Sequence, residues 1–209
     1  DFNCSYYSET EVHTGVKQAM KNVMLLGPYS SGKSSLLQVL KSKGFDGKKQ
    51  PTIGVDLSVI HQNENKVYYW DFSGRRTFDF VVKPFIERAS GVIYVIDADK
   101  FNLDETEFWL NFVKENSDGK TLNKYLFVTK TDKVNIRCIE KKLEDFINKH
   151  NFDAVRYCTA YDPDTIFRAF SCIENHKTHN NELKFFSTNS KNKKNKRDAC
   201  SFLDCCLSR

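Results

Sequence analysis

The stretch that decides the fold is GPYSSGKS, residues 27–34. It fits the phosphate-binding loop pattern, in which a glycine and a Gly-Lys-Ser end let backbone N–H groups converge on phosphate oxygens. An apolar run at 22–26 precedes it and an amphipathic run follows it, which is the strand–loop–helix context that the pattern requires. The alternative, a chance Gly-Lys-Ser turn, does not explain that context. We expect Lys33 to reach the outer phosphates and the Ser34 hydroxyl to bind magnesium.

Working outward from the loop, short apolar runs alternate with longer amphipathic ones, which is typical of an α/β fold. We predict a P-loop NTPase fold, a mostly parallel six-stranded sheet with helices on both faces. The predicted strands are 22–26, 55–61, 67–72, 91–96, 125–128 and 154–158, and the predicted helices are 34–40, 103–115, 136–149 and 163–175. The polar gap at 62–65 is the length of a turn, so the second and third strands should form an antiparallel hairpin.

The composition fits one globular domain of ordinary size with a tail. The 209 residues are 40% hydrophobic and 28% charged, and the longest apolar stretches, 23–26 and 92–96, are far too short to span a bilayer. We divide the chain into an N-terminal extension (1–20), the nucleotide-binding domain (21–176) and a disordered basic tail (177–209). The tail holds eight basic and three acidic residues, a surplus equal to the whole formal charge of +5. It therefore favours an anionic partner such as a membrane surface, and we expect no nucleic-acid partner for the body.

Four further motifs follow the loop in a fixed order, at 51–56, 71–74, 129–132 and 159–161. Together with the loop they resemble a Ras-superfamily small GTPase, and the resemblance extends over residues 22–176. It implies a G domain that binds GTP or GDP with Mg²⁺. The nucleotide contacts that it implies are Ser30, Ser31, Gly32, Lys33, Ser34, Ser35, Phe45, Thr52, Gly74, Thr129, Lys130, Asp132, Thr159, Ala160 and Tyr161.

The resemblance also assigns roles around the outer phosphate and the metal. Ser34, Thr52 and Asp71 form the implied metal site, with Asp71 acting through water. Thr52 would sense the γ-phosphate, so that its segment is ordered with GTP and released after hydrolysis. The backbone N–H of Gly74 would bind the same phosphate, at a point where a side chain would obstruct the approach.

The base-reading positions favour guanine over adenine. Asp132 would accept from the ring N–H and the exocyclic amine of guanine, while Lys130 packs along the nucleotide and the Ala160 backbone donates to the guanine carbonyl. Phe45 stands where the family places an aromatic residue against the base, although a loop anchor in the body explains it as well. An ATP-using P-loop enzyme is a further alternative, but the compact spacing leaves no room for a substrate or lid insertion.

The implied catalytic positions are Arg75, Tyr29 and Thr52, and the chain departs from the family pattern at Arg75 and Tyr29. Arg75 stands where the family usually has a Gln that orients the attacking water, and a guanidinium has donors but no acceptor. Tyr29 occupies a loop position that is usually small. We predict slow intrinsic hydrolysis, with Arg75 as an arginine finger in cis as the alternative. Thr129 in place of Asn, and Tyr161 in place of Lys, predict weaker nucleotide affinity.

The segment Thr52–Asp56 and Trp70 resemble the Rab branch of the superfamily. Cys205 and Cys206 resemble a Rab double-cysteine terminus, which implies prenylation, and the basic run 193–197 would supply a second membrane signal. An exposed thiol pair on a solubilising tail and a nuclear-localisation-like patch remain alternatives.

These features predict a Rab-like GTP/GDP switch in intracellular vesicle and membrane traffic. Its switch regions would recruit effector proteins, and an exchange factor and a GTPase-activating protein would regulate it. The expected location is cytoplasmic, peripheral on the cytosolic face of an intracellular membrane. The alternative is a hydrolysis-deficient GTP-binding scaffold that acts as a constitutive binding module.

Overall fold

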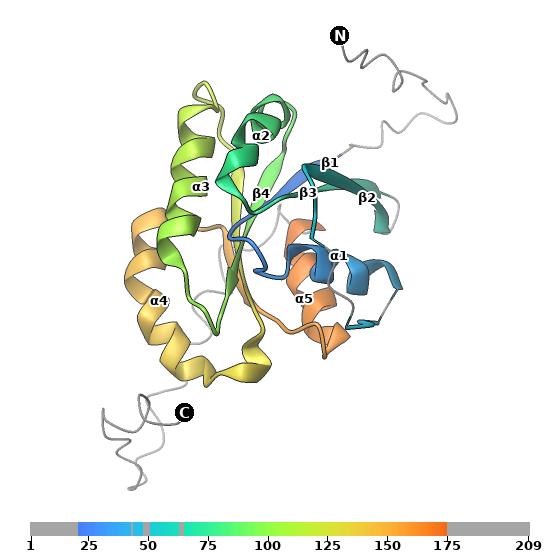
Figure 1. Cartoon of the computed structure of the whole chain (residues 1–209), viewed down its shortest axis with the longest axis vertical. Helices are drawn as coiled ribbons and strands as arrows, with labels where there is room; N and C mark the ends of the chain where they lie inside the picture. The colour runs from blue at the N-terminus through green and yellow to red at the C-terminus, as the bar shows by residue number, and fades with distance from the viewer. Residues whose placement is uncertain (1–20, 43, 48–50, 63–64, 175–209) are drawn as a thin grey trace, which may run out of the picture. The chain divides into compact units, whose positions relative to one another are not determined.

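The computed structural model describes residues 21–42, 44–47, 51–62 and 65–174, which form a sheet between two layers of helices (Figure 1). The strands are β1 (Lys21–Leu26), β2 (Val55–Gln62), β3 (Asn65–Phe72), β4 (Gly91–Asp97), β5 (Asn123–Thr129) and β6 (Ala154–Tyr157). The helices are α1 (Lys33–Ser42), α2 (Asp79–Ile86), α3 (Leu103–Glu115), α4 (Ile136–His150) and α5 (Pro163–Glu174), with short 3₁₀ turns η1 (Arg76–Phe78) and η2 (Thr131–Lys133).

The strand order is β2-β3-β1-β4-β5-β6, with β2 antiparallel to β3 and every other pair parallel. This confirms the predicted mostly parallel six-stranded sheet and its hairpin. Strand β1 lies between β3 and β4. The strands that follow β1 in the chain, β2 and β3, lie on one side of it, and β4, β5 and β6 lie on the other, so the strand order reverses at β1. Open α/β sheets bind ligands at such a switch point, outside the carboxyl ends of the strands.

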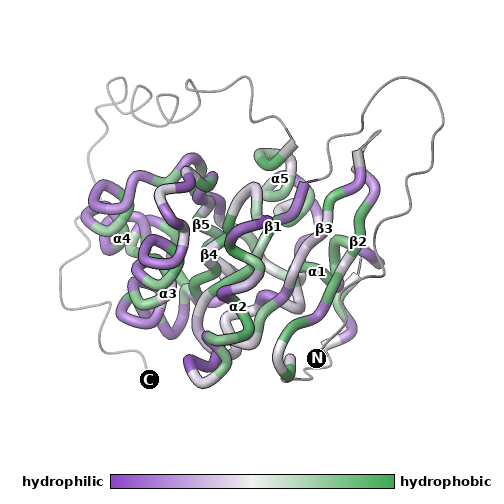
Figure 2. The backbone as a smooth tube through the Cα atoms, turned by 90° about the horizontal axis from the view of Figure 1, so that it is seen from above, coloured by the Kyte–Doolittle hydropathy of each residue, from purple (hydrophilic) through white to green (hydrophobic). Residues whose placement is uncertain are grey.

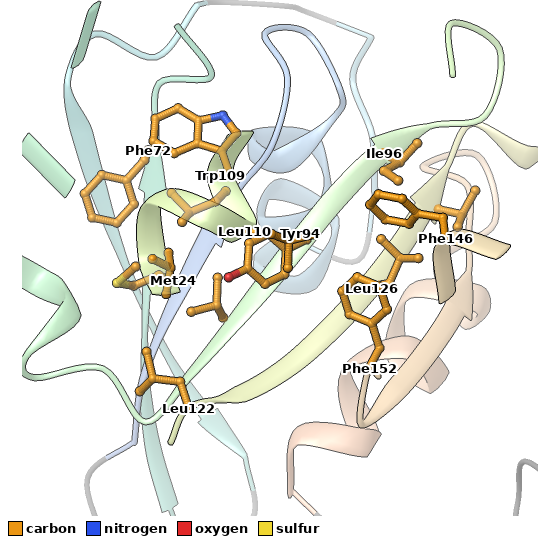
Figure 3. Close-up of a cluster of buried hydrophobic side chains, with 14 of the residues drawn as sticks. Met24, Phe72, Tyr94, Ile96, Trp109, Leu110, Leu122, Leu126, Phe146 and Phe152 are labelled. Carbon is orange, nitrogen blue, oxygen red and sulfur yellow. The ribbon is translucent and has the colours of Figure 1, made fainter. Parts of the chain in front are cut away.

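Alternating side chains of β1 fill two separate cores. Val23 and Leu25 pack with α1 and α5, whereas Met24 and Leu26 pack on the opposite face with α2, α3 and α4. Figure 3 shows the second core, in which the fully buried Trp109 of α3 lies among side chains from the strands. The central strands β4 and β5 are largely hydrophobic and the outer turns of α3 and α4 hydrophilic (Figure 2), as expected for strands covered on both faces.

Helix α2 was not among the predicted helices. Its sequence, DFVVKPFI, is almost continuously apolar and contains Pro84, and the residue before it, Phe78, provides no side-chain cap. These features hide the helical period, although Val82 and Ile86, four residues apart, are buried as an amphipathic helix requires. The four predicted helices and six predicted strands occur within a few residues of their expected bounds.

The predicted extension (1–20) and tail (177–209), with Cys205 and Cys206, lie outside the described residues. Among the residues that are described, no helix combines the length and hydropathy needed to cross a bilayer.

Candidate nucleotide-binding site

The loop between β1 and α1 is tightly folded around Lys33. Gly27 has a φ of +142°, and a Cβ there would lie 2.3 Å from the carbonyl oxygen of Val95, so only glycine fits. The Lys33 ammonium donates to the carbonyls of Gly27 (3.0 Å) and Pro28 (2.9 Å). Burial lowers the pKa of Lys33 to about 8, and the nearby Asp71 charge partly opposes this shift. Among the described residues this buried ammonium bonds neutral oxygens, so it is suited to receive an anion.

A cavity of about 420 Å³ opens beside this loop. Its lining comes from the loop, from α1, from β2 and the residues before it, from the end of β3 and the residues after it, and from the residue after β5. The predicted site residues in its lining are Tyr29, Ser30, Gly32, Lys33, Ser34, Ser35, Thr52, Asp71, Gly74 and Lys130.

Three oxygen-bearing side chains converge on one wall of the cavity. The Ser34 hydroxyl lies 2.5 Å from Asp71 Oδ2 and 2.8 Å from Thr52 Oγ1, and Thr52 Oγ1 lies 3.2 Å from the same carboxylate oxygen. Asp71 is buried, which raises the pKa of its carboxyl, while hydrogen bonds from Ser34 and the Lys33 charge act in the opposite direction. Its Oδ1 is buried and, among the residues that the structure describes, has no hydrogen-bond partner.

Lys130 connects the loop after β5 with the phosphate-binding loop. It adopts a left-handed backbone conformation (φ +57°), and its ammonium donates to Asp97 Oδ2 (2.5 Å) and to the carbonyl of Ser30 (2.8 Å). Asp97, at the end of β4, also accepts the backbone N–H of Asp99 (2.9 Å). This carboxylate therefore fixes both the turn after β4 and the direction of the lysine.

The remaining base-reading positions lie together at the ends of β5 and β6. Asp132 accepts a hydrogen bond from the Thr159 hydroxyl (2.5 Å), and Tyr161 packs edge-on against Phe45 with ring centroids 5.6 Å apart. Tyr161 is 72% exposed, so one side of this aromatic pair is open to a planar ligand.

Thr129 acts from beneath the loop and does not line the cavity. It is buried, and its hydroxyl bonds the carbonyls of Ser31 (2.5 Å) and Ile96 (3.1 Å). A hydroxyl therefore ties β5 to the phosphate-binding loop at the position where the sequence departs from Asn.

Arg75 and Tyr29, the two unusual positions that the sequence predicts to be catalytic, contact each other. The guanidinium carbon of Arg75 lies 4.9 Å from the centre of the Tyr29 ring, within cation–π range. Next to Arg75, Gly74 is pressed against the loop: a Cβ there would lie 2.4 Å from the Tyr29 nitrogen and 2.5 Å from the carbonyl carbon of Pro28. The segment after β3 thus rests directly on the phosphate-binding loop.

Comparison with known proteins identifies the family. The model for the Roc family (Ras of Complex, Roc, domain of DAPkinase) matches residues 22–132. The Ras-related protein Rab-18 of Lymnaea stagnalis is 30% identical over 148 residues, covering 68% of this chain and 71% of that protein. This chain belongs to the Rab-like small GTPases of the Ras superfamily. Rab-18-B of Danio rerio is 32% identical (62% of this chain, 65% of that protein), and RABC1 of Arabidopsis thaliana is 33% identical (57% and 59%).

Small GTPases bind GTP or GDP and usually Mg²⁺, and the side chains of this Rab-like GTPase fit both groups. A magnesium ion prefers oxygen ligands and neutralises phosphate charge when bound. The Ser34 and Thr52 hydroxyls would be such ligands, and Asp71 Oδ1, which has no hydrogen-bond partner among the described residues, would accept from a metal-bound water. The buried Lys33 ammonium beside them supplies positive charge for the phosphates.

Sequence reasoning missed Asp97 in this Rab-like GTPase. Asp97 is a buried carboxylate at the carboxyl end of β4, beside the strand ends that carry the motifs. That position is the signal that could have revealed it, because polar side chains at the carboxyl ends of adjacent parallel strands meet at one edge of the sheet.

Proposed function

We propose that this Rab-like GTPase is a GTP/GDP switch of vesicle traffic whose intrinsic hydrolysis is slow. The proposal rests on the contact between Arg75 and Tyr29. Arg75 occupies the position of the water-orienting Gln of the family, and Tyr29 occupies a loop position that is usually small. Lys33, Ser34 and Thr52 would hold the phosphates and the metal, while Lys130 and Asp132 would hold the base.

The chemistry of the contact supports slow turnover. In small GTPases the Gln amide oxygen accepts a hydrogen bond from the attacking water, whereas a guanidinium offers donors only. The Tyr29 ring lines the cavity and is 49% exposed, so it stands at the edge of the phosphate end. Arg75 lies over this ring and carries donors only, so the residue in the Gln position cannot orient a water by accepting its hydrogen.

Hydrolysis of pre-loaded GTP tests this proposal. We would extract the nucleotide from purified protein, reload it with GTP and Mg²⁺, and follow phosphate release over hours. Wild-type protein should release phosphate slowly but measurably, and Arg75→Gln combined with Tyr29→Gly should release it at least about 100-fold faster, the lower end of what a positioned catalytic group contributes. Arg137→Gln, an exposed arginine on α4, is the matched control and should change nothing.

Two results would decide against the proposal. Wild-type turnover at a rate ordinary for the family would show that Arg75 and Tyr29 do not slow the reaction. A double variant that is no faster than wild type would show that the block lies elsewhere. If wild-type protein retains GTP without any turnover, the constitutive scaffold becomes the better description.

Partners would meet the two segments that contact the phosphate end. Ile53, next to Thr52, is 82% exposed, and Phe80 on α2 is 69% exposed, so both offer apolar surface for effectors. An exchange factor and a GTPase-activating protein would act on the same segments. For the membrane, we propose prenylation of Cys205 and Cys206 with help from the basic tail. Mass spectrometry of protein isolated from eukaryotic cells should detect the lipid, and replacing both cysteines with serine should release the protein from membranes.

A further inference from the structure

The segment that follows Gly74 is attached to α3 by Arg76, the second arginine of the pair. Arg76 Nη2 lies 2.9 Å from Glu105 Oε1, and its Nε donates to Glu105 Oε2 at 3.1 Å. Both carboxylate oxygens are therefore engaged in a two-pronged bond, the geometry in which an arginine–carboxylate pair is most specific.

An aromatic ring completes this attachment. The Arg76 guanidinium carbon lies 4.3 Å from the centre of the Phe108 ring, one helical turn beyond Glu105 on the same face of α3. Phe108 in turn packs against Trp109 and Phe112, with ring centroids 5.2 and 6.1 Å apart. The arginine is thus held between a carboxylate and a ring that the core supports.

The acceptor is itself fixed in place. Glu105 lies in the first turn of α3, where its backbone N–H donates to the side chain of the cap residue Asn102 (3.2 Å). Arg75, one residue earlier than Arg76, reaches the opposite way, to Tyr29. Consecutive arginines therefore attach the start of the segment to the phosphate-binding loop and to α3, through contacts that include no nucleotide.

We propose that Arg76 is a positioning residue which, with Glu105 and Phe108, holds residues 74–78 against α3, beside the phosphate-binding loop, whether GDP or GTP is bound. We call these three residues the Arg76 clamp. The change of order with nucleotide state then falls on the Thr52 segment alone. This inference rests on the proposed function only in taking GDP and GTP as the ligands.

The clamp is strong enough to matter for a local equilibrium. Arg76 and Glu105 side chains are 49% and 28% exposed, so solvent weakens the ion pair, and the ring adds a comparable contribution. Together they should shift the opening equilibrium of the segment by roughly fivefold to thirtyfold. That range is within reach of hydrogen exchange.

Hydrogen–deuterium exchange of the full chain loaded with GDP or with a non-hydrolysable GTP analogue tests the clamp. In wild-type protein, peptides covering 74–86 should exchange within about twofold of each other in the two states, while those covering 51–56 should exchange several-fold faster with GDP. Arg76→Ala should speed exchange of 74–86 in the GDP form by at least about fivefold, and Arg76→Lys, which keeps the charge but not the two-pronged bond, should fall between.

The control is Lys149→Ala, which removes another surface ion pair of α3, with Glu107, and should leave 74–86 unchanged. The clamp is refuted if 74–86 in wild-type protein already exchanges several-fold faster with GDP, or if Arg76→Ala behaves like the control. Failure to bind either nucleotide, or equal exchange of 51–56 in both states, would instead count against the proposed function. The comparison of Arg76→Ala with Lys149→Ala in nucleotide-free protein then decides the clamp by itself.

Discussion

Replacing Asp97 with asparagine isolates the charge that directs Lys130. The change is almost isosteric, and the amide oxygen can still accept the N–H of Asp99, so the turn after β4 is preserved. What is lost is the carboxylate 2.5 Å from the lysine ammonium, in a pair whose side chains are 4% and 20% exposed. A hydrogen bond to a charged group contributes about 1.5–3 kcal/mol, and little solvent is present here to compensate.

The free energy lost with the Asp97 charge can reduce nucleotide affinity, the stability of the fold, or both. If the whole loss falls on the bound state, GDP release becomes roughly 10–100-fold faster, because about 1.4 kcal/mol corresponds to a factor of ten. Any part that falls on the folded state lowers the unfolding temperature by about 2–4 °C per kcal/mol. The assays are release of fluorescent GDP into excess GTP and thermal unfolding of the same samples. Asp99→Asn, an exposed carboxylate two residues on, is the matched control. Equal release rates and equal unfolding temperatures for the two variants would refute a role for Asp97 in directing Lys130.

Two further predictions concern the phosphate-binding loop. Burial lowers the pKa of Lys33 to about 8, so above that pH the neutral amine must take up a proton before it can pair with a phosphate. The affinity for GDP, measured without Mg²⁺, should therefore fall by up to about tenfold per pH unit above 8. Lys33→Arg, which stays charged, should flatten that profile, and a parallel fall in both proteins would contradict this explanation. Thr129→Val keeps the shape but leaves the Ser31 carbonyl without its hydroxyl donor, which should destabilise the protein by about 1–3 kcal/mol in denaturant unfolding. A loss within the error of the extrapolation would mean that the loop does not depend on this bond.

The sequence allowed most of the fold to be predicted because each strand and four of the helices show their period locally. Helix α2 could not be predicted, since Pro84 and an almost continuous apolar run conceal its period. The motifs predicted ten of the residues that line the cavity, because the loop pattern and the strand ends impose that placement, whereas Thr129 and the positions after β6 lie outside its lining. The pairing of Arg75 with Tyr29, and of Lys130 with Asp97, joins residues far apart in the chain, and no local pattern signals which side chains meet.

These pairings bear on how binding and hydrolysis can be separated in this Rab-like GTPase. Lys33, Lys130 and Arg75 each contact the phosphate-binding loop itself, through loop carbonyls in the first two cases and the Tyr29 ring in the third. The loop is therefore held in shape before a phosphate arrives, which lowers the entropic cost of binding. Tyr29→Gly removes only the third of these contacts, so it should change the rate of hydrolysis far more than the affinity for GDP. A large loss of affinity in that variant would mean that the ring maintains the loop, and that Tyr29 and Arg75 act first on binding.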